Sequence, residues 1–75
     1  MSRLPALTPA KVLRALQRAG SYIHHTKGSH YYLKHPEKLG LRVTLPYHSG
    51  DPKRRILMSI VEQAGYTIEE FLGLL

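Results

Sequence analysis

The chain has 75 residues, with 11 lysines and arginines against five acidic residues, no cysteine, a net charge of +6 at pH 7 and a pI near 10.0. This length allows one small domain over residues 1–75 and excludes a cleft between two domains, while the lack of cysteine excludes disulfides and thiolate-bound zinc. The excess of positive charge favours a polyanionic partner, most commonly nucleic acid, over a basic protein without such a partner.

The N-terminal segment, residues 1–10, has neither the apolar run of a secretory signal peptide nor a membrane-spanning stretch. The lack of disulfide-forming residues suits a reducing compartment. We therefore expect a soluble cytoplasmic protein that has no membrane partner.

The segment LTPAKVLRALQRAGS, residues 7–21, predicts a helix with both ends marked. Thr8 suits the N-cap, and Pro9 suits the first helical position because its missing N–H would be unpaired there. Gly20 suits the end of the helix, since glycine readily adopts the left-handed conformation. Apolar residues recur at helical spacing on one side and cations lie opposite: Val12, Ala15, Leu16 and Ala19 against Lys11, Arg14 and Arg18.

Three short strands are predicted next, over Ser21–Thr26, Ser29–His35 and Leu41–Pro46. Their β-branched and aromatic residues favour strands, and Lys27-Gly28 supplies a turn between the first two. Pro36 ends the second strand and begins a polar connection to the third. These short connections favour an antiparallel sheet in which the strands follow chain order.

Two helices complete the predicted fold. Asp51 suits the N-cap of the first and Pro52 its first position, and Gly65 ends it. Thr67 and Glu70 have the spacing of a capping box at the start of a short last helix. The expected buried residues are Ile56, Leu57, Ile60, Val61 and Ala64 in the first, and Ile68, Phe71, Leu72 and Leu75 in the second. The order α-β-β-β-α-α predicts a two-layer α+β domain, a three-stranded antiparallel sheet with one face under helices and the other open.

Alternation along the strands predicts which side chains the open face carries. Leu33 belongs in the core, so its neighbours at odd spacing point outward, and the same argument applies to the third strand around Val43. The expected open-face residues are His30, Tyr32, Lys34, Arg42 and Thr44, while Leu41, Val43 and Leu45 are expected to be buried. Such a set could bind a sugar–phosphate backbone, although a plain solvated face would show the same alternation.

The expected start of the second helix carries Lys53, Arg54 and Arg55, where the helix dipole favours acidic residues. A phosphate held between them by free backbone N–H groups would offset this cost. We therefore predict phosphate contacts at these three residues, although a tolerated run of surface charge has the same sequence.

Five histidines lie in the middle of the chain: His24, His25, His30, His35 and His48. Their spacing matches no standard zinc pattern and no cysteine completes a ligand set, so we expect no metal and no cofactor. His24 and His25 are neighbours on one strand and are expected to point to opposite faces. His25 and His35 are readily explained as half-buried packing residues.

The segments KGSHYYLKHP, LRVTLPYHSG and ILMSIVEQAGYTIEEFLGLL, in this order and spacing, resemble HicA-type toxins, the mRNA interferases of toxin–antitoxin modules. The resemblance runs from about Lys11 to Leu75. Two positions differ from the usual pattern of such proteins. Ser21 replaces an aromatic residue, with Tyr22 one place later, and Arg55-Ile56 replaces a Gly-Thr pair.

The resemblance implies a fold like a double-stranded-RNA-binding domain, RNA cleavage in the cytosol and a HicB-type antitoxin that covers the active site. It also implies that His30 is the catalytic histidine, with Gly28 and Ser29 shaping the approach to it. The oligomeric state and the RNA sequence preference are not indicated.

The implied chemistry suits a single imidazole. RNA carries its own nucleophile, the 2′-hydroxyl, and histidine exchanges protons near neutral pH. We expect His30 to act as general acid/base, Lys27, Lys34 and Arg42 to contact phosphate, and Tyr32 to stack on a base. The alternatives are a double-stranded-RNA-binding module without activity, or a small protein-interaction domain with little salt-dependent affinity for RNA.

Overall fold

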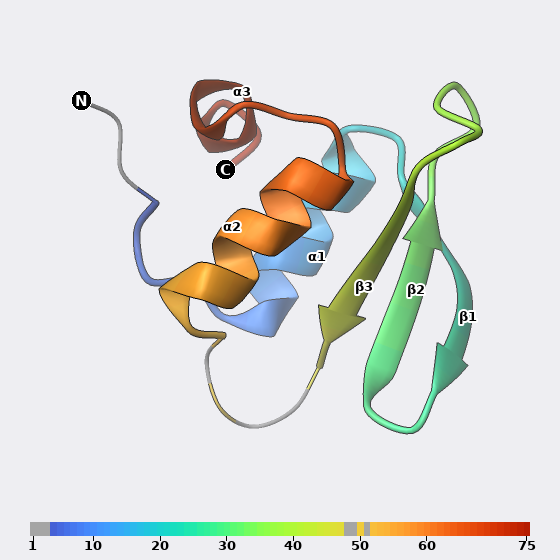
Figure 1. The fold of residues 1–75 in the computed structure, drawn as a ribbon, viewed down its shortest axis with the longest axis horizontal. Helices are drawn as coiled ribbons and strands as arrows, with labels where there is room; N and C mark the ends of the chain where they lie inside the picture. The colour runs from blue at the N-terminus through green and yellow to red at the C-terminus, as the bar shows by residue number, and fades with distance from the viewer. Residues whose placement is uncertain (1–3, 48–49, 51) are drawn as a thin grey trace.

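Two helices, α1 (Pro9–Arg18) and α2 (Arg54–Gln63), cover one face of a three-stranded sheet in the computed structural model (Figure 1). A short helix, α3 (Ile68–Leu72), lies on the side of α1 and α2 away from the sheet. The structure describes residues 4–47, 50 and 52–75. Within these residues no helix is long and apolar enough to cross a membrane.

The sheet contains β1 (Tyr22–Lys27), β2 (His30–Lys34) and β3 (Arg42–Pro46), in that spatial order and with both pairs antiparallel. The predicted α+β class and the predicted strand order are confirmed, and the arrangement is consistent with a double-stranded-RNA-binding-domain-like fold. The strand boundaries differ from the prediction by one residue or less at each end. A single helical layer on one sheet face leaves the other face free of helices.

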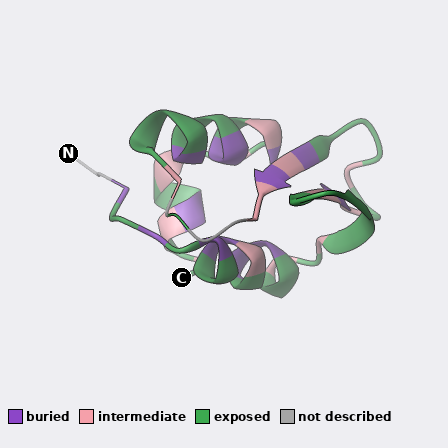
Figure 2. Cartoon of the chain, turned by 90° about the horizontal axis from the view of Figure 1, so that it is seen from below, coloured by how far each residue is buried: buried purple, intermediate pink, exposed green. Residues whose placement is uncertain are grey.

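The core lies between the sheet and the helices, where Figure 2 shows the buried residues gathering. Leu33 and Leu45 contribute fully buried side chains from the sheet, and Phe71 contributes one from α3. The helices supply the remainder, mainly through Val12, Ala15, Leu16, Leu57, Ile60, Val61 and Ala64. Leu4 and Leu7, which precede α1, are also buried and extend the core beyond the predicted elements.

Three residues that the sequence predicted to be buried are exposed: Leu41 by 36%, Ile56 by 38% and Leu75 by 44%. Leu41 lies one residue before β3, so it is outside the regular alternation of the strand. Ile56 lies in the first turn of α2, where the buried stripe starts one residue later. Leu75 lies beyond the end of α3, and the preceding Leu74 packs on the core instead.

The predicted ends of α1 are confirmed. The side chain of Thr8 accepts a hydrogen bond from the backbone N–H of Lys11 at 3.2 Å, and Pro9 is the first helical residue. Ala19 is the C-cap, and Gly20 follows it with a φ of +102°, a conformation that costs a residue with a Cβ about 1–2 kcal/mol. The capping box of α3 is also confirmed, with Thr67 and Glu70 bonded reciprocally at 2.8 and 3.1 Å.

The predicted start of α2 is wrong by two residues. The helix begins at Arg54, and the N-cap is Lys53, which has an extended backbone and makes no side-chain cap. The carbonyl oxygen of Lys53 accepts the first helical hydrogen bond, from Leu57 at 3.0 Å. Pro52 therefore precedes the helix, and the predicted cap at Asp51 lies outside the described residues.

Candidate functional site

A tight turn brings β1 back as β2 and positions the first residue of β2. Lys27 and His30 are paired across the two strands, so Gly28 and Ser29 form the connection. Gly28 has a φ of +58°, which glycine adopts without strain. The carbonyl oxygen of Ser29 accepts a hydrogen bond from the backbone of Tyr47 at 2.6 Å, which ties the turn to the end of β3.

His30 lies on the open face of the sheet and is exposed to solvent. Its cross-strand neighbours are Lys27 on β1 and Pro46 on β3. The next residue, Tyr31, faces the core and stacks on Tyr47 with ring centroids 4.7 Å apart. The imidazole of His30 is therefore accessible from the solvent, and Lys27 lies in the neighbouring cross-strand position.

Two further rows of side chains continue this open face along the strands. The first row pairs His25, Tyr32 and Thr44, and the second pairs Tyr22, Lys34 and Arg42. The structure thus brings together, on one face, the sequence-predicted residues Lys27, His30, Tyr32, Lys34 and Arg42. The guanidinium of Arg42 lies 5.9 Å from the ring centroid of Tyr32, which is within the range of a cation–π contact.

The outer edge of β3 is covered by a side chain from α2. The backbone N–H of Thr44 points away from β2 and donates to Oε1 of Gln63 at 3.0 Å. Nε2 of Gln63 in turn donates to Oγ of Ser59 at 2.9 Å, which fixes the orientation of the amide. The open face therefore ends at the outer edge of β3, where the side chain of Gln63 occupies the backbone N–H of Thr44.

A β-bulge in β1 changes the positions expected for two histidines. The pairing register shifts between Ile23, opposite Leu33, and His25, opposite Tyr32, so that His24 is the extra residue. The prediction that His24 and His25 point to opposite faces is wrong, because their Nδ1 atoms lie 2.8 Å apart.

His25 is also exposed rather than half-buried, which corrects the second expectation for this residue. Its ring stacks on Tyr32 with centroids 4.5 Å apart and an angle of 11° between the planes. Sequence reasoning missed His25 as an open-face residue. Tyr32, the residue expected to offer a stacking surface, is half-buried, and His25 already covers part of its ring.

His35 has a structural position, as expected for a half-buried packing residue. Its Nε2 atom lies 2.7 Å from the carbonyl oxygen of Ala19, and its Nδ1 atom accepts the backbone N–H of Glu37 at 3.0 Å. These two bonds define a neutral ring with its proton on Nε2, since Nδ1 must hold a lone pair. His48, the fifth histidine, lies outside the described residues.

The cations at the start of α2 do not share the face that carries His30. Lys53, Arg54 and Arg55 are exposed but belong to the helical layer, which covers the opposite face of the sheet (Figure 1). These three cations therefore form a second basic area, separate from the open face. The phosphate contacts predicted for them remain a prediction.

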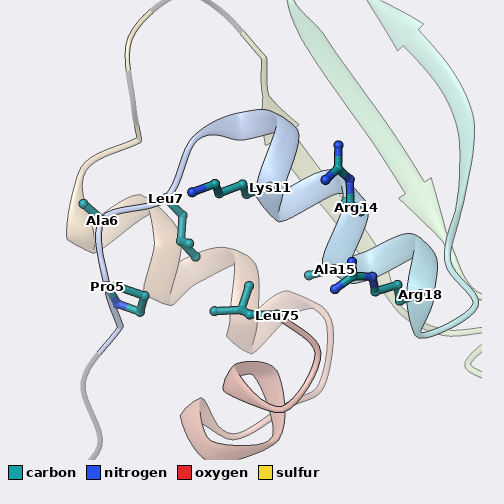
Figure 3. A pocket seen from close by; sticks show the side chains of 8 residues that line it. All are labelled: Pro5, Ala6, Leu7, Lys11, Arg14, Ala15, Arg18 and Leu75. Atoms are coloured by element: carbon teal, nitrogen blue, oxygen red, sulfur yellow. The ribbon is translucent and has the colours of Figure 1, made fainter.

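A hollow of about 400 Å³ lies between α1, the segment that precedes α1 and the last residue, Leu75 (Figure 3). Lys11, Arg14 and Arg18 line it together with apolar residues that include Leu7 and Leu75. Arg18 donates from Nη1 to the carbonyl oxygen of Leu74 at 3.2 Å, so part of this charge holds the chain end in position. None of the open-face residues lines this hollow.

Among the described residues, no group of three or more His, Asp or Glu side chains is placed to hold a metal ion. The open face presents imidazoles, a phenolic hydroxyl and cations, from residues that include His25, His30, Tyr32 and Lys27. This set of groups suits proton transfer next to a phosphate group.

Comparison with known proteins identifies one family. The family model described as HicA toxin of bacterial toxin–antitoxin matches residues 9–66, which include α1, the whole sheet and α2. No curated protein matches the chain.

Proposed function

We propose that this chain, which belongs to the HicA toxin family of bacterial toxin–antitoxin systems, is an endoribonuclease that cleaves messenger RNA. The observation that carries RNA cleavage is the exposed His30 on an open sheet face beside Lys27, with Lys34 and Arg42 on the same face. An accessible imidazole within a field of fixed cations is suited to a reaction at a phosphodiester.

The reaction needs one nucleophile, which the substrate supplies. The 2′-oxygen of a ribose attacks the adjacent phosphorus, its bond to phosphorus forms, and the bond from phosphorus to the 5′-oxygen of the next nucleotide breaks. The products are a 2′,3′-cyclic phosphate and a free 5′-hydroxyl. His30 exchanges a proton with one of the two oxygens, while nearby cations stabilise the charge that builds on the phosphoryl oxygens.

The shape of the open face allows an RNA strand to approach His30. None of the helices that the structure describes covers the open face, so a single strand with unstacked bases can lie along it. RNA-binding proteins commonly read such strands by stacking. The space around Gly28, next to His30, is open: a Cβ at this position would have no neighbour within 4 Å other than its adjacent residues. We expect loose sequence preference from such a shallow site.

A HicB-type antitoxin is the proposed protein partner, and the cytoplasm, where mRNA is available, is the proposed location. Family membership supports an antitoxin partner, since the matched family consists of toxins from toxin–antitoxin pairs. The open face is a suitable surface for such a protein because covering it would block access to His30.

A double-stranded-RNA-binding module without activity is the second candidate, and the basic area at Lys53, Arg54 and Arg55 favours it. These cations would hold a backbone phosphate whether or not the RNA is cleaved. Binding alone gives no reason for an exposed histidine directly after the Gly28–Ser29 turn.

Incubation of the purified protein with labelled single-stranded RNA in excess EDTA distinguishes the two functions. RNA cleavage by the wild type, lost in His30→Ala while RNA binding persists, is the expected result. The absence of cleavage by the wild type both with EDTA and with added divalent metal ions, with RNA affinity equal in both proteins, would establish the binding module instead. A sensitivity of cleavage to EDTA would contradict the metal-independent mechanism.

A further inference from the structure

Cleavage of RNA by its own 2′-hydroxyl requires two proton transfers at different places. The 2′-oxygen must lose a proton, and the 5′-oxygen must gain one as it leaves. Attacking and leaving oxygens lie roughly in line on opposite sides of phosphorus. A single imidazole placed at one oxygen is therefore poorly placed for the other, and a second proton-exchanging group is needed.

Besides His30, the part of the open face that the structure describes carries the imidazole of His25, a side chain of the right kind. Lysine and arginine on this face act mainly as fixed cations, whereas histidine is the side chain that exchanges protons near neutral pH. Because of the bulge at His24, the ring of His25 lies on the same face as His30. Without this extra residue, His25 would point to the same side of the sheet as Ile23, which is opposite Leu33 and away from His30.

The pairing register places the two histidines one diagonal step apart. Lys27 is opposite His30, Tyr32 is opposite His25, and diagonal neighbours of this kind lie about 7–8 Å apart. Side chains that start at this separation can place their rings on either side of a single phosphodiester. One nitrogen of each ring is then within hydrogen-bond reach, about 2.6–3.2 Å, of a different oxygen.

The contact between His24 and His25 allows His25 to change its protonation without losing its partner. Two Nδ1 atoms at 2.8 Å need one proton between them, so one ring donates and the other accepts. If His24 is the imidazolium and donates, His25 is neutral and carries its own proton on Nε2. When His25 gives up that proton, the shared proton moves to its Nδ1, and both rings are left neutral and still bonded.

The surroundings of His25 hold its ring in a fixed orientation. The ring stacks on Tyr32 at 4.5 Å and meets His24 edge to face at 5.1 Å. The other charged or titratable groups that the structure describes on this face are Arg42, 5.9 Å from the Tyr32 ring, Lys27 and His30 in one adjacent row, and Tyr22 and Lys34 in the other. Because these contacts already restrict the His25 ring, it loses less conformational freedom when a substrate binds.

We propose that His25 is a second catalytic residue of the RNA-cleaving face, with His24 as its positioning residue; this inference rests on the proposed function. One of His25 and His30 removes the proton from the 2′-oxygen, and the other donates a proton to the departing 5′-oxygen. The electron pair of the broken P–O bond stays on the 5′-oxygen, and no external oxidant or metal takes part.

The decisive variant is His25→Phe, which keeps an aromatic ring on Tyr32 and removes both ring nitrogens. We expect His25→Phe to bind RNA as the wild type does and to cleave it about 10²-fold more slowly or worse, in line with the loss of a general acid or base. His25→Gln serves as a second variant without the ring, and thermal unfolding of both verifies that they fold. Cleavage by folded His25→Phe at the wild-type rate would overturn the inference and leave the proposed function intact.

A substrate with sulfur in place of the bridging 5′-oxygen separates the two roles, because a thiolate leaves without being protonated. We expect only one of His25→Phe and His30→Ala to recover near wild-type rate on this substrate. Recovery of both variants, or of neither, would overturn the division of roles between the two histidines. If the wild type cleaves neither substrate, the proposed function fails, and the inference fails with it.

His24→Gln tests the positioning role. We expect it to lower the rate less than His25→Phe does and to move one limb of the pH–rate profile, which reports the proton-exchanging groups. A pH profile identical to that of the wild type would show that His24 is not part of the proton transfer.

Discussion

The Nε2 atom of His35 lies 2.7 Å from the carbonyl oxygen of Ala19, and this hydrogen bond joins the end of β2 to the end of α1. The second ring nitrogen accepts the backbone N–H of Glu37, so the imidazole satisfies one acceptor and one donor of the main chain. His35 therefore holds the sheet against the helical layer from a position outside the open face.

Replacement of His35 by leucine should lower the free energy of unfolding by about 1–2 kcal/mol, because Ala19 and Glu37 lose their partners. Urea denaturation monitored by circular dichroism measures the change. Cleavage per folded molecule should stay at the wild-type level, since the ring is not on the open face. A large loss of activity in the folded variant would contradict this assignment.

Replacement of Gly20 by alanine should destabilise the protein more than the same change at Gly28. Both glycines have positive φ, but a Cβ at Gly20 would lie 2.8 Å from Nε2 of His35, whereas one at Gly28 meets nothing within 4 Å. Gly28→Ala should therefore cost only the left-handed strain, about 1–2 kcal/mol. Chemical denaturation of both variants gives the comparison, and equal losses would show that the contact with His35 is easily relieved.

The capping box of α3 should contribute measurably to stability because α3 carries the fully buried Phe71. Thr67→Ala should cost about 1 kcal/mol, because the backbone N–H of Glu70 loses its acceptor. Glu69→Ala is a suitable control, since this residue is in the same turn and takes no part in the box. Thermal unfolding of both variants measures the difference, which should vanish if the cap is not formed in solution.

The two basic areas should differ in what they do to RNA. Arg42→Gln should lower the cleavage rate at saturating RNA, because Arg42 lies on the face with His30. A triple glutamine replacement at Lys53, Arg54 and Arg55 should weaken binding without changing that rate. For single strands, removing one phosphate-binding cation should reduce the slope of log affinity against log salt concentration by about 0.7. A fall in the saturated rate of the triple variant would place these cations at the reacting phosphate.

Much of the fold could be predicted because local signals agree with the packing. Thr8 with Pro9, and Thr67 with Glu70, marked helix starts through short-range hydrogen bonds that depend on nearby residues alone. Alternation around Leu33 identified the buried side of β2. The start of α2 could not be read in this way, because Pro52 also suits the extended segment that ends in Lys53.

The candidate site was predictable where it follows a turn and unpredictable where a strand is irregular. Alternation around Leu33 predicted His30 on the open face, directly after a turn, and the structure places it there at the start of β2. His25 was missed because all six residues of β1 are exposed, so no buried residue in the strand marks the register shift. Periodicity cannot detect one extra residue in such a strand.

The amide of Gln63 over the outer edge of β3 has a consequence for how copies of this protein meet. A strand edge with free N–H groups can recruit a neighbouring chain and start ordered aggregates. At Thr44 that N–H is already occupied by the side chain of Gln63, and at the opposite edge the bulge beside Ile23 interrupts the regular ladder. Both borders of the sheet thus offer a second copy of the chain an interrupted row of backbone partners, which disfavours edge-to-edge pairing.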